Sequence, residues 1–260
     1  DPAGLDYRPT IDPSSEGRGV KYFVPWALAR MVGEWNFYRS ESTPQLVLGE
    51  RVSMSNEYTD RGNYYHLPRM DLTVSDCVPE DYVSGDLEDW VDGALTFDGA
   101  RTAVLIHAEM TKDMAYPRRE GKIAYDGSKR ETLDMDTNNF LIELVLRTEA
   151  TGGTLVAKSD GTNGYALSIA GDGGVDLTLQ VAGAEVPAGS VVRVNDGEWH
   201  HVIAEVDREA GSVVFYVDGQ VAGTAALGIA SEASLANQAD FLVGEGFVGA
   251  IDFLRLARST

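Results

Sequence analysis

Short segments of alternating apolar and polar residues run along most of the chain, whereas the three-to-four-residue spacing of an amphipathic helix is nearly absent. From residue 94 onward the segments recur about every ten residues, separated by Asp-Gly, Asn-Gly and Gly-Gly turns. This pattern predicts an all-β fold in which two antiparallel sheets stack as a sandwich. After residue 137 the predicted strands are 138–149, 153–160, 164–171, 175–183, 190–194, 198–207, a hairpin at 212–225, 240–246 and 248–258.

The segment FLIELVLRTE shows the alternation clearly. One face carries Phe140, Ile142, Leu144 and Leu146, and the other carries Glu143, Arg147 and Glu149. We expect the first face to lie in the core and the carboxylates of the second to be solvated. Further upstream, ALTFDGARTAVLI at 94–106 predicts two strands that pair across the turn Asp-Gly-Ala.

The amino-terminal third is less regular. Residues 1–28 are rich in Pro, Gly, Ser and Asp and are interpreted as a linker or the edge of an upstream region. We expect one sandwich over residues 29–260, because residues 1–90 hold too few strands to bury a core of their own. Its other predicted features are a short helix candidate at 25–35, strands at 32–40, 45–54 and 70–74, and irregular insertions at 56–93 and 107–137.

The charge balance narrows the possible partners. The chain has 41 Asp and Glu residues against 21 Lys and Arg residues, a net charge of −20. Such a surface repels phosphate backbones, so nucleic acid is not an expected partner. Insertion into a membrane is not expected either, because no apolar run approaches the roughly 20 residues that span a bilayer.

The stretch NDGEWHHVIAEVD at 195–207 raises the question of a metal or catalytic pair at His200 and His201. Neighbouring residues of a strand point to opposite faces, so the two imidazoles cannot share one ion unless a bulge intervenes. No further ligand stands at a useful spacing. We interpret the stretch as an Asp-Gly turn followed by a strand that Trp199 anchors in the core.

Several of these segments, taken in order, resemble a known family. DGEWHHV, the hairpin VVFYVDGQVAG and the closing GAIDFLRLAR resemble the laminin G-like modules of the concanavalin A-like lectin/glucanase superfamily. The resemblance covers residues 94 to 258. It implies a two-sheet antiparallel jelly roll with long loop insertions, an extracellular, cell-surface or periplasmic setting, and binding of a carbohydrate or a protein.

The resemblance also raises the question of enzyme activity, since the superfamily includes glycoside hydrolases and polysaccharide lyases. Its hydrolases place their carboxylates on one strand in a pattern like Glu-x-Asp-x-x-Glu, which this sequence lacks. Its lyases use clusters of Arg, Gln-x-His and Tyr, and no Gln-x-His is present. We therefore expect a protein that is not an enzyme.

A calcium ion is implied by the resemblance, because modules of this kind often bind Ca²⁺ between an early strand and the closing strand. Asp98 in FDGA and Asp252 in GAIDFL match those positions. Carboxylate and carbonyl oxygens suit this hard cation. The alternative is that Asp98 caps a turn and Asp252 pairs with a neighbouring backbone group.

Sugar binding usually needs an exposed aromatic platform with planar polar groups beside it. The densest aromatic group outside regular strands lies in the 56–93 insertion, where binding groups on loops are common. The predicted ligand-binding residues are Tyr58, Tyr64, Tyr65, His66 and Trp90.

These observations predict a non-catalytic recognition module of a secreted or cell-surface protein that binds a glycan or polysaccharide. Two alternatives stay open. The first is a structural or assembly domain that contacts a partner protein or other domains of the same polypeptide. The second is a polysaccharide-active hydrolase or lyase, which would bring two carboxylates or an Arg/His/Tyr cluster together on one sheet.

Overall fold

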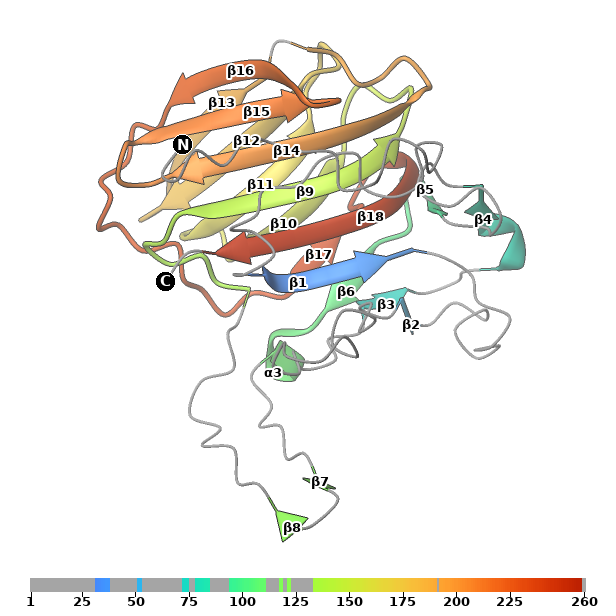
Figure 1. Ribbon diagram of the computed structural model, residues 1–260, viewed down its shortest axis with the longest axis horizontal. Coiled ribbons are helices and arrows are strands. Elements are labelled where there is room, and N and C mark those ends of the chain that lie inside the picture. The colour runs from blue at the N-terminus through green and yellow to red at the C-terminus, as the bar shows by residue number, and fades with distance from the viewer. Residues whose placement is uncertain are drawn as a thin grey trace.

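A computed structural model shows two antiparallel sheets stacked face to face (Figure 1), as the alternation predicts. It describes residues 31–37, 51–52, 72–74, 78–84, 94–110, 117–118, 121–122, 133–190 and 192–258. The described segments and the two-layer arrangement confirm the predicted antiparallel two-sheet sandwich.

The first sheet has eight strands in the order β16-β15-β14-β9-β18-β5-β4, and β1 also pairs with β18. Every pairing in it is antiparallel. Its strands are β1 (Met31–Asn36), β4 (Tyr82–Val83), β5 (Ala94–Asp98), β9 (Phe140–Arg147), β14 (Trp199–Asp207), β15 (Ser212–Val217), β16 (Gln220–Ala226) and β18 (Val248–Arg258).

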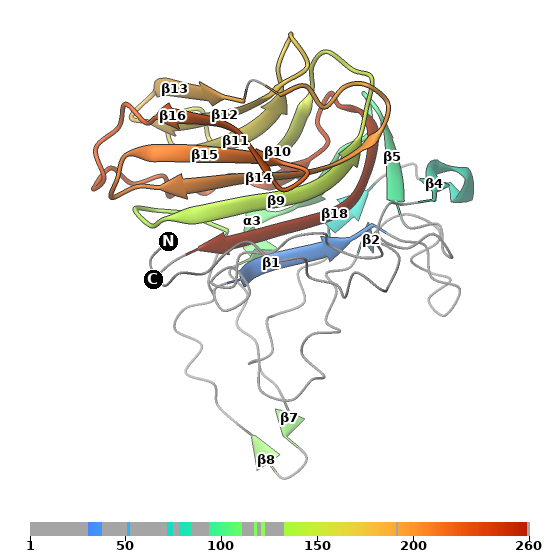
Figure 2. The ribbon, with the colours of Figure 1, turned by 45° about the horizontal axis from the view of Figure 1, so that its top comes forward.

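The second sheet also has eight strands, in the order β13-β12-β11-β10-β17-β6-β3-β2. Turned by 45°, the molecule shows this sheet behind the first, with β13 close to β16 (Figure 2). Its strands are β2 (Arg51–Val52), β3 (Leu72–Val74), β6 (Ala103–Leu105), β10 (Thr154–Ser159), β11 (Gly164–Ile169), β12 (Val175–Val181), β13 (Ala184–Gly189) and β17 (Phe241–Val243).

The remaining described elements are short. They are the 3₁₀ helix η2 (Pro79–Asp81), the helix α3 (His107–Met110) and the hairpin of β7 (Pro117–Arg118) with β8 (Gly121–Lys122). None of the helices among the described residues has the length and apolar character needed to cross a bilayer.

The core lies between the inner faces of the two sheets, as the period-two pattern requires. In β9 the side chains of Phe140, Ile142, Leu144 and Leu146 are buried there. Trp35 of β1 stacks on Phe241 of β17, with ring centroids 5.4 Å apart, so one aromatic pair joins the two sheets.

The prediction that residues 94–106 form a strand pair is wrong. Both strands exist, but β5 pairs with β4 and β18 of the first sheet, whereas β6 pairs with β3 and β17 of the second. The turn between them carries the chain across the core. Asp98 stabilises this turn, because its Oδ1 accepts hydrogen bonds from the backbone N–H groups of Ala100 and Arg101.

The strand predicted at 190–194 is also misplaced, since the strand of this region is β13, at 184–189. Pro187 made this segment a poor strand candidate, but proline is tolerated on an edge strand, and β13 is the edge of its sheet. Beyond β13 the chain leaves the ladder: the backbone N–H of Val194 donates to the carbonyl of Gly173.

The amino-terminal segment joins the same sandwich as the rest. β1 pairs with β18, and β2 and β3 extend the second sheet beside β6. The strands expected near 32–40 and 70–74 are thus present as β1 and β3. Residues 25–30 of the helix candidate and the predicted linker 1–28 lie outside the described residues.

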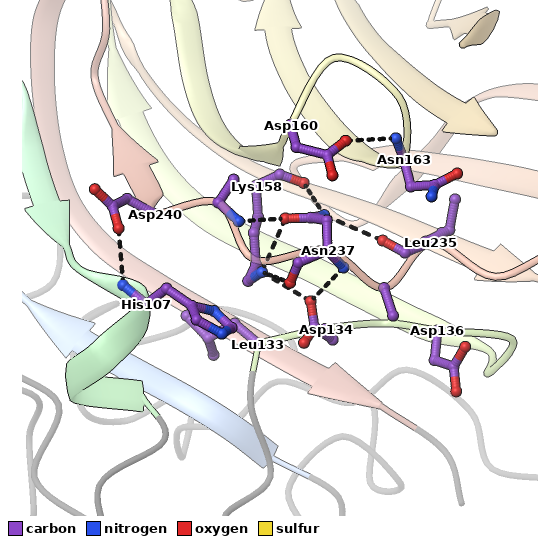
Figure 3. A network of polar contacts seen from close by, with 12 residues as sticks. His107, Leu133, Asp134, Asp136, Lys158, Asp160, Asn163, Leu235, Asn237 and Asp240 are labelled. Carbon is purple, nitrogen blue, oxygen red and sulfur yellow. Dashed lines mark hydrogen bonds and ion pairs between the residues drawn. The ribbon is translucent and has the colours of Figure 1, made fainter. Parts of the chain in front are cut away.

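A buried lysine fixes the long connection between β16 and β17. Lys158 of β10 is fully buried, and its Nζ lies 2.7 Å from Asp134 Oδ1, 2.9 Å from the Asn237 carbonyl and 3.0 Å from Asn237 Oδ1 (Figure 3). All three donors of the ammonium group therefore have acceptors. This arrangement ties β10, the segment before β9 and the 227–240 connection together.

We expect Lys158→Met to lower the free energy of unfolding by about 2–4 kcal/mol, because it leaves the Asp134 carboxylate without its buried cation. Urea unfolding followed by circular dichroism measures the change. Adding Asp134→Asn to that variant should recover part of the loss, since the orphaned charge is gone. A Lys158→Met protein as stable as the wild type would contradict a stabilising role for this network.

Candidate functional site

One end of the first sheet gathers charged and aromatic side chains. β9 ends there and β14 begins, with Arg147 opposite Trp199, and β5 ends opposite the start of β18, with Asp98 opposite Val248. Ala250 of β18 also faces Arg147, so these strand ends are neighbours. We call this end, with the turns 195–198 and 218–219, the rim.

His200 holds the two turns of the rim together. Its Nδ1 lies 2.8 Å from Asp218 Oδ2, and its Nε2 lies 2.9 Å from Asp196 Oδ1. Ionised carboxylates only accept hydrogen bonds, so both ring nitrogens donate and the imidazole is protonated. The bond to Asp218, aided by the one to Asp196 and opposed by burial, raises the pKa of His200 to about 9.

The turn before β14 depends on two of its residues. Gly197 has φ of 86°, and a Cβ there would lie 3.1 Å from Glu149 Oε1, so glycine suits both the conformation and the space. Asp196 Oδ1 accepts a hydrogen bond from the Glu198 backbone N–H, which is the main reason that the pKa of Asp196 is lowered. The Asp-Gly turn expected from the sequence is confirmed.

Trp199 and Arg147 form a cation–π pair on the outer face of the sheet, the face turned away from the main core. The Arg147 Cζ lies 4.8 Å from the centre of the Trp199 ring, and both side chains are half-buried. Trp199 packs on Val145 and Phe253. The expectation that Trp199 lies in the core is therefore wrong: it shares its strand parity with His201 and points outward.

A charged cluster lies farther along the same outer face. Glu143 Oε1 is 2.8 Å from His201 Nε2, and Glu143 Oε2 is 2.8 Å from Arg255 Nη1. All three side chains are at most 1% exposed. We call this group the outer-face triad. His200 and His201 thus serve opposite faces, as alternation predicted, and they share no ligand site.

The expectation that Glu143 is solvated is wrong. It lies beside Arg255 because Glu143 and Arg255 are opposite each other in the β9–β18 ladder, and beside His201 because β14 runs along the other side of β9. Tyr216 and Glu205 lie on the same face, with 3.5 Å between the phenol oxygen and Oε2. A cluster of Arg, His, Tyr and carboxylates therefore exists, and the triad at its centre is buried.

The two predicted calcium ligands occupy different environments. Asp98 is exposed, and its pKa is lowered mainly by the backbone N–H of Arg101, then by that of Ala100. Asp252 is buried at a bulge of β18, four residues beyond the register partner of Asp98, or about 13 Å along the strand.

In the described segments, no three or more His, Cys, Asp or Glu side chains gather as a metal site. Among these segments, the residues that flank Asp98 and Asp252 therefore form no preformed set of carboxylates. Calcium at Asp98 and Asp252 stays a prediction. The predicted ligand-binding residues Tyr58, Tyr64, Tyr65, His66 and Trp90 lie outside the described residues.

Comparison with known families gives one match. A laminin G family model, described as the concanavalin A-like lectin/glucanases superfamily, matches residues 124–259, which is just over half of the chain. The match begins later than the resemblance found in the sequence, at residue 124 instead of 94. No curated protein has a matching sequence.

Among solved structures, mouse laminin alpha1 chain domains LG4-5 share 22% identity with a TM-score of 0.45, covering 64% of this chain and 42% of that one. The CBM40 module of a Ruminococcus gnavus IT-sialidase, bound to alpha2,3 sialyllactose, shares 17% identity with a TM-score of 0.36 and covers 47% and 77% of the two chains. This chain therefore spans less than half of the laminin structure. At such scores the likenesses carry no argument about ligands.

The His200 contacts predict a stability that depends on pH. The pKa of His200 is about 9 in the folded protein against 6.5 without these contacts, so the stabilisation is complete below about pH 6.5 and is lost as the pH rises through 9. Because the partner carboxylates are exposed, we expect about 1–2 kcal/mol.

Urea unfolding of wild type and His200→Gln tests this expectation. The wild type should be the more stable at about pH 6, and the difference should shrink towards about pH 10. Glu198→Gln changes the neighbouring turn without removing the imidazole and should keep the wild-type pH dependence. A difference that is constant with pH would show that His200 stabilises by packing alone.

Proposed function

Since this chain belongs to the concanavalin A-like lectin/glucanases superfamily, we propose that it is a non-catalytic recognition module that binds a glycan at the rim. The observation that supports this site most directly is the Trp199–Arg147 pair, an aromatic ring and a guanidinium that are half-buried where β14 begins and β9 ends. We place the module in an extracellular or cell-surface protein, the setting implied by the resemblance.

The chemistry of the rim suits a neutral or cationic sugar surface. An indole packs against the C–H groups of a pyranose ring, while arginine and carboxylate groups hydrogen-bond to hydroxyls. Asp196 and Asp218 add carboxylates on the neighbouring turns, where both are bonded to His200, and Glu149 follows Arg147 by two residues. Tyr58, Tyr64, Tyr65, His66 and Trp90 remain proposed contributors from the 56–93 insertion.

The outer-face triad supports a non-catalytic reading. Glu143 is hydrogen-bonded on both oxygens to His201 and Arg255, and all three side chains are buried. A general acid or base must reach the substrate proton within hydrogen-bonding distance. These groups instead neutralise one another inside the protein, so we assign them a structural role.

Calcium is a second part of the proposal. Asp98 is an exposed carboxylate at the rim, where β5 ends, and oxygen ligands suit Ca²⁺. A bound ion there would order the β5–β6 turn, and sugar hydroxyls could coordinate it. A thermal-shift titration with CaCl₂ should raise the melting temperature of the wild type and not that of Asp98→Asn.

A glycan array probed with the full chain, with and without EDTA, tests glycan recognition. For a glycan that binds, we expect Arg147→Gln to weaken affinity at least about tenfold, because the guanidinium contributes charge-assisted hydrogen bonds. The control is Arg193→Gln, which removes the same charge from an exposed position outside the pair. This variant should bind the glycan like the wild type.

Two results would overturn this proposal. The first is no glycan binding under either condition together with stable association to a partner protein, which would favour the assembly alternative. The second is depolymerisation of a polysaccharide that is lost when Glu143 or His201 is replaced, which would establish a hydrolase or lyase.

A further inference from the structure

The outer edge of β16 is open. β16 is the last strand of the first sheet and pairs only with β15. Within the part of the chain that the structure describes, residues 220–226 have no hydrogen-bonded strand partner other than β15. An edge of this kind presents unpaired backbone donors and acceptors that match another extended chain.

β16 lacks the usual protection of an edge strand. The run Gln220–Gly228 holds no charged residue and no proline, in a chain with a net charge of −20. β13, the neighbouring edge of the other sheet, contains Glu185 and Pro187 (Figure 2). Charges and prolines on an edge disfavour pairing with other molecules, so β13 is protected where β16 is not.

A bulge divides β16 into two parts. The register shifts so that Gly223 faces Phe215 and Val221 faces Tyr216, which leaves Ala222 as the extra, buried residue. Beyond the bulge, Gly223–Ala226 form a regular ladder. There Ala225 packs against the core, while the side chains of Thr224 and Ala226 are exposed. The available edge is therefore the stretch from 223 to 226.

We propose that this edge pairs with β16 of a second copy of the chain, antiparallel and about a two-fold axis, so that the first sheets of two molecules become one continuous sheet. An isologous contact brings the same surface from each copy together. Two chains that each carry a charge of −20 repel one another, and the stretch from 223 to 226 holds no charged residue, so pairing along it brings no carboxylates of the two strands together. This inference does not depend on glycan binding.

The contact is short, so the dimer is weak. A single strand pair falls below the roughly 1,200 Å² of a standard interface, and we expect a dissociation constant on the order of 10–100 µM. Added salt should strengthen the dimer, because it screens the repulsion between the two acidic molecules.

Sedimentation velocity of the full chain, from about 1 µM to about 200 µM at low and high NaCl, measures this association. Thr224→Glu places like charges near each other across the axis, and we expect the dimer to weaken at least about tenfold. Thr224→Val keeps the edge uncharged and should dimerise like the wild type. Val78→Glu adds the same charge at an exposed position near β4, the opposite edge of this sheet, and should also dimerise.

Circular dichroism and melting temperatures establish that each variant is folded. A wild type that stays monomeric over the whole range of concentration and salt would overturn the proposal, even if β16 then accepts a strand from another protein. A Thr224→Glu variant that dimerises with an unchanged dissociation constant would also overturn it.

Discussion

The antiparallel pairing of β9 with β18 is the contact on which the rest of the sandwich depends. β18 is the longest described strand, and it also pairs with β1 and β5, so it joins the two ends of the chain to its middle. Both faces of this strand pair are buried. A carboxylate on the outer face is therefore kept from water, and Glu143 instead forms an ion pair with Arg255 and a hydrogen bond with His201.

Buried cations also stabilise the long connections between strands, by hydrogen bonds to their carbonyl groups. Lys158 binds the 227–240 connection through Asn237, and Arg208 donates to the carbonyls of Asp136, Ala230, Ser231 and Ala233. Burial lowers the pKa of Arg208, so its contacts with carbonyl dipoles must offset the cost of desolvation. A connection without regular secondary structure is in this way fixed to the body of the sandwich.

The rim differs from these interior clusters because its charges meet water. His200 joins two turns by bonds to Asp196 and Asp218, while Trp199 and Arg147 are half-buried at the same end of the sheet. The same fold supports many functions through its loops, so the function of this protein has to be sought in such side chains and not in the sandwich itself.

Local patterns in the sequence determined most of the strands. Alternation placed β9, β10, β11, β12, β14, β15 and β18, and the Asp-Gly pairs placed their turns. It also separated His200 from His201, because the direction of a side chain in a strand follows from its position alone. The same rule could have placed Trp199 on the outer face, because this residue shares its strand parity with His201, Glu205 and Asp207.

Only the tertiary structure decided which strands become neighbours. β5 and β6 follow one another in the sequence yet belong to different sheets, since the aromatic core lies between them. Glu143 and Arg255 meet across 112 positions, and no local pattern contains that register. The sequence alone therefore predicted the all-β sandwich and, for most strands, which side chains share a face. The pairing order, the buried charges and the composition of the rim depend on contacts between distant residues, which form only when the chain folds.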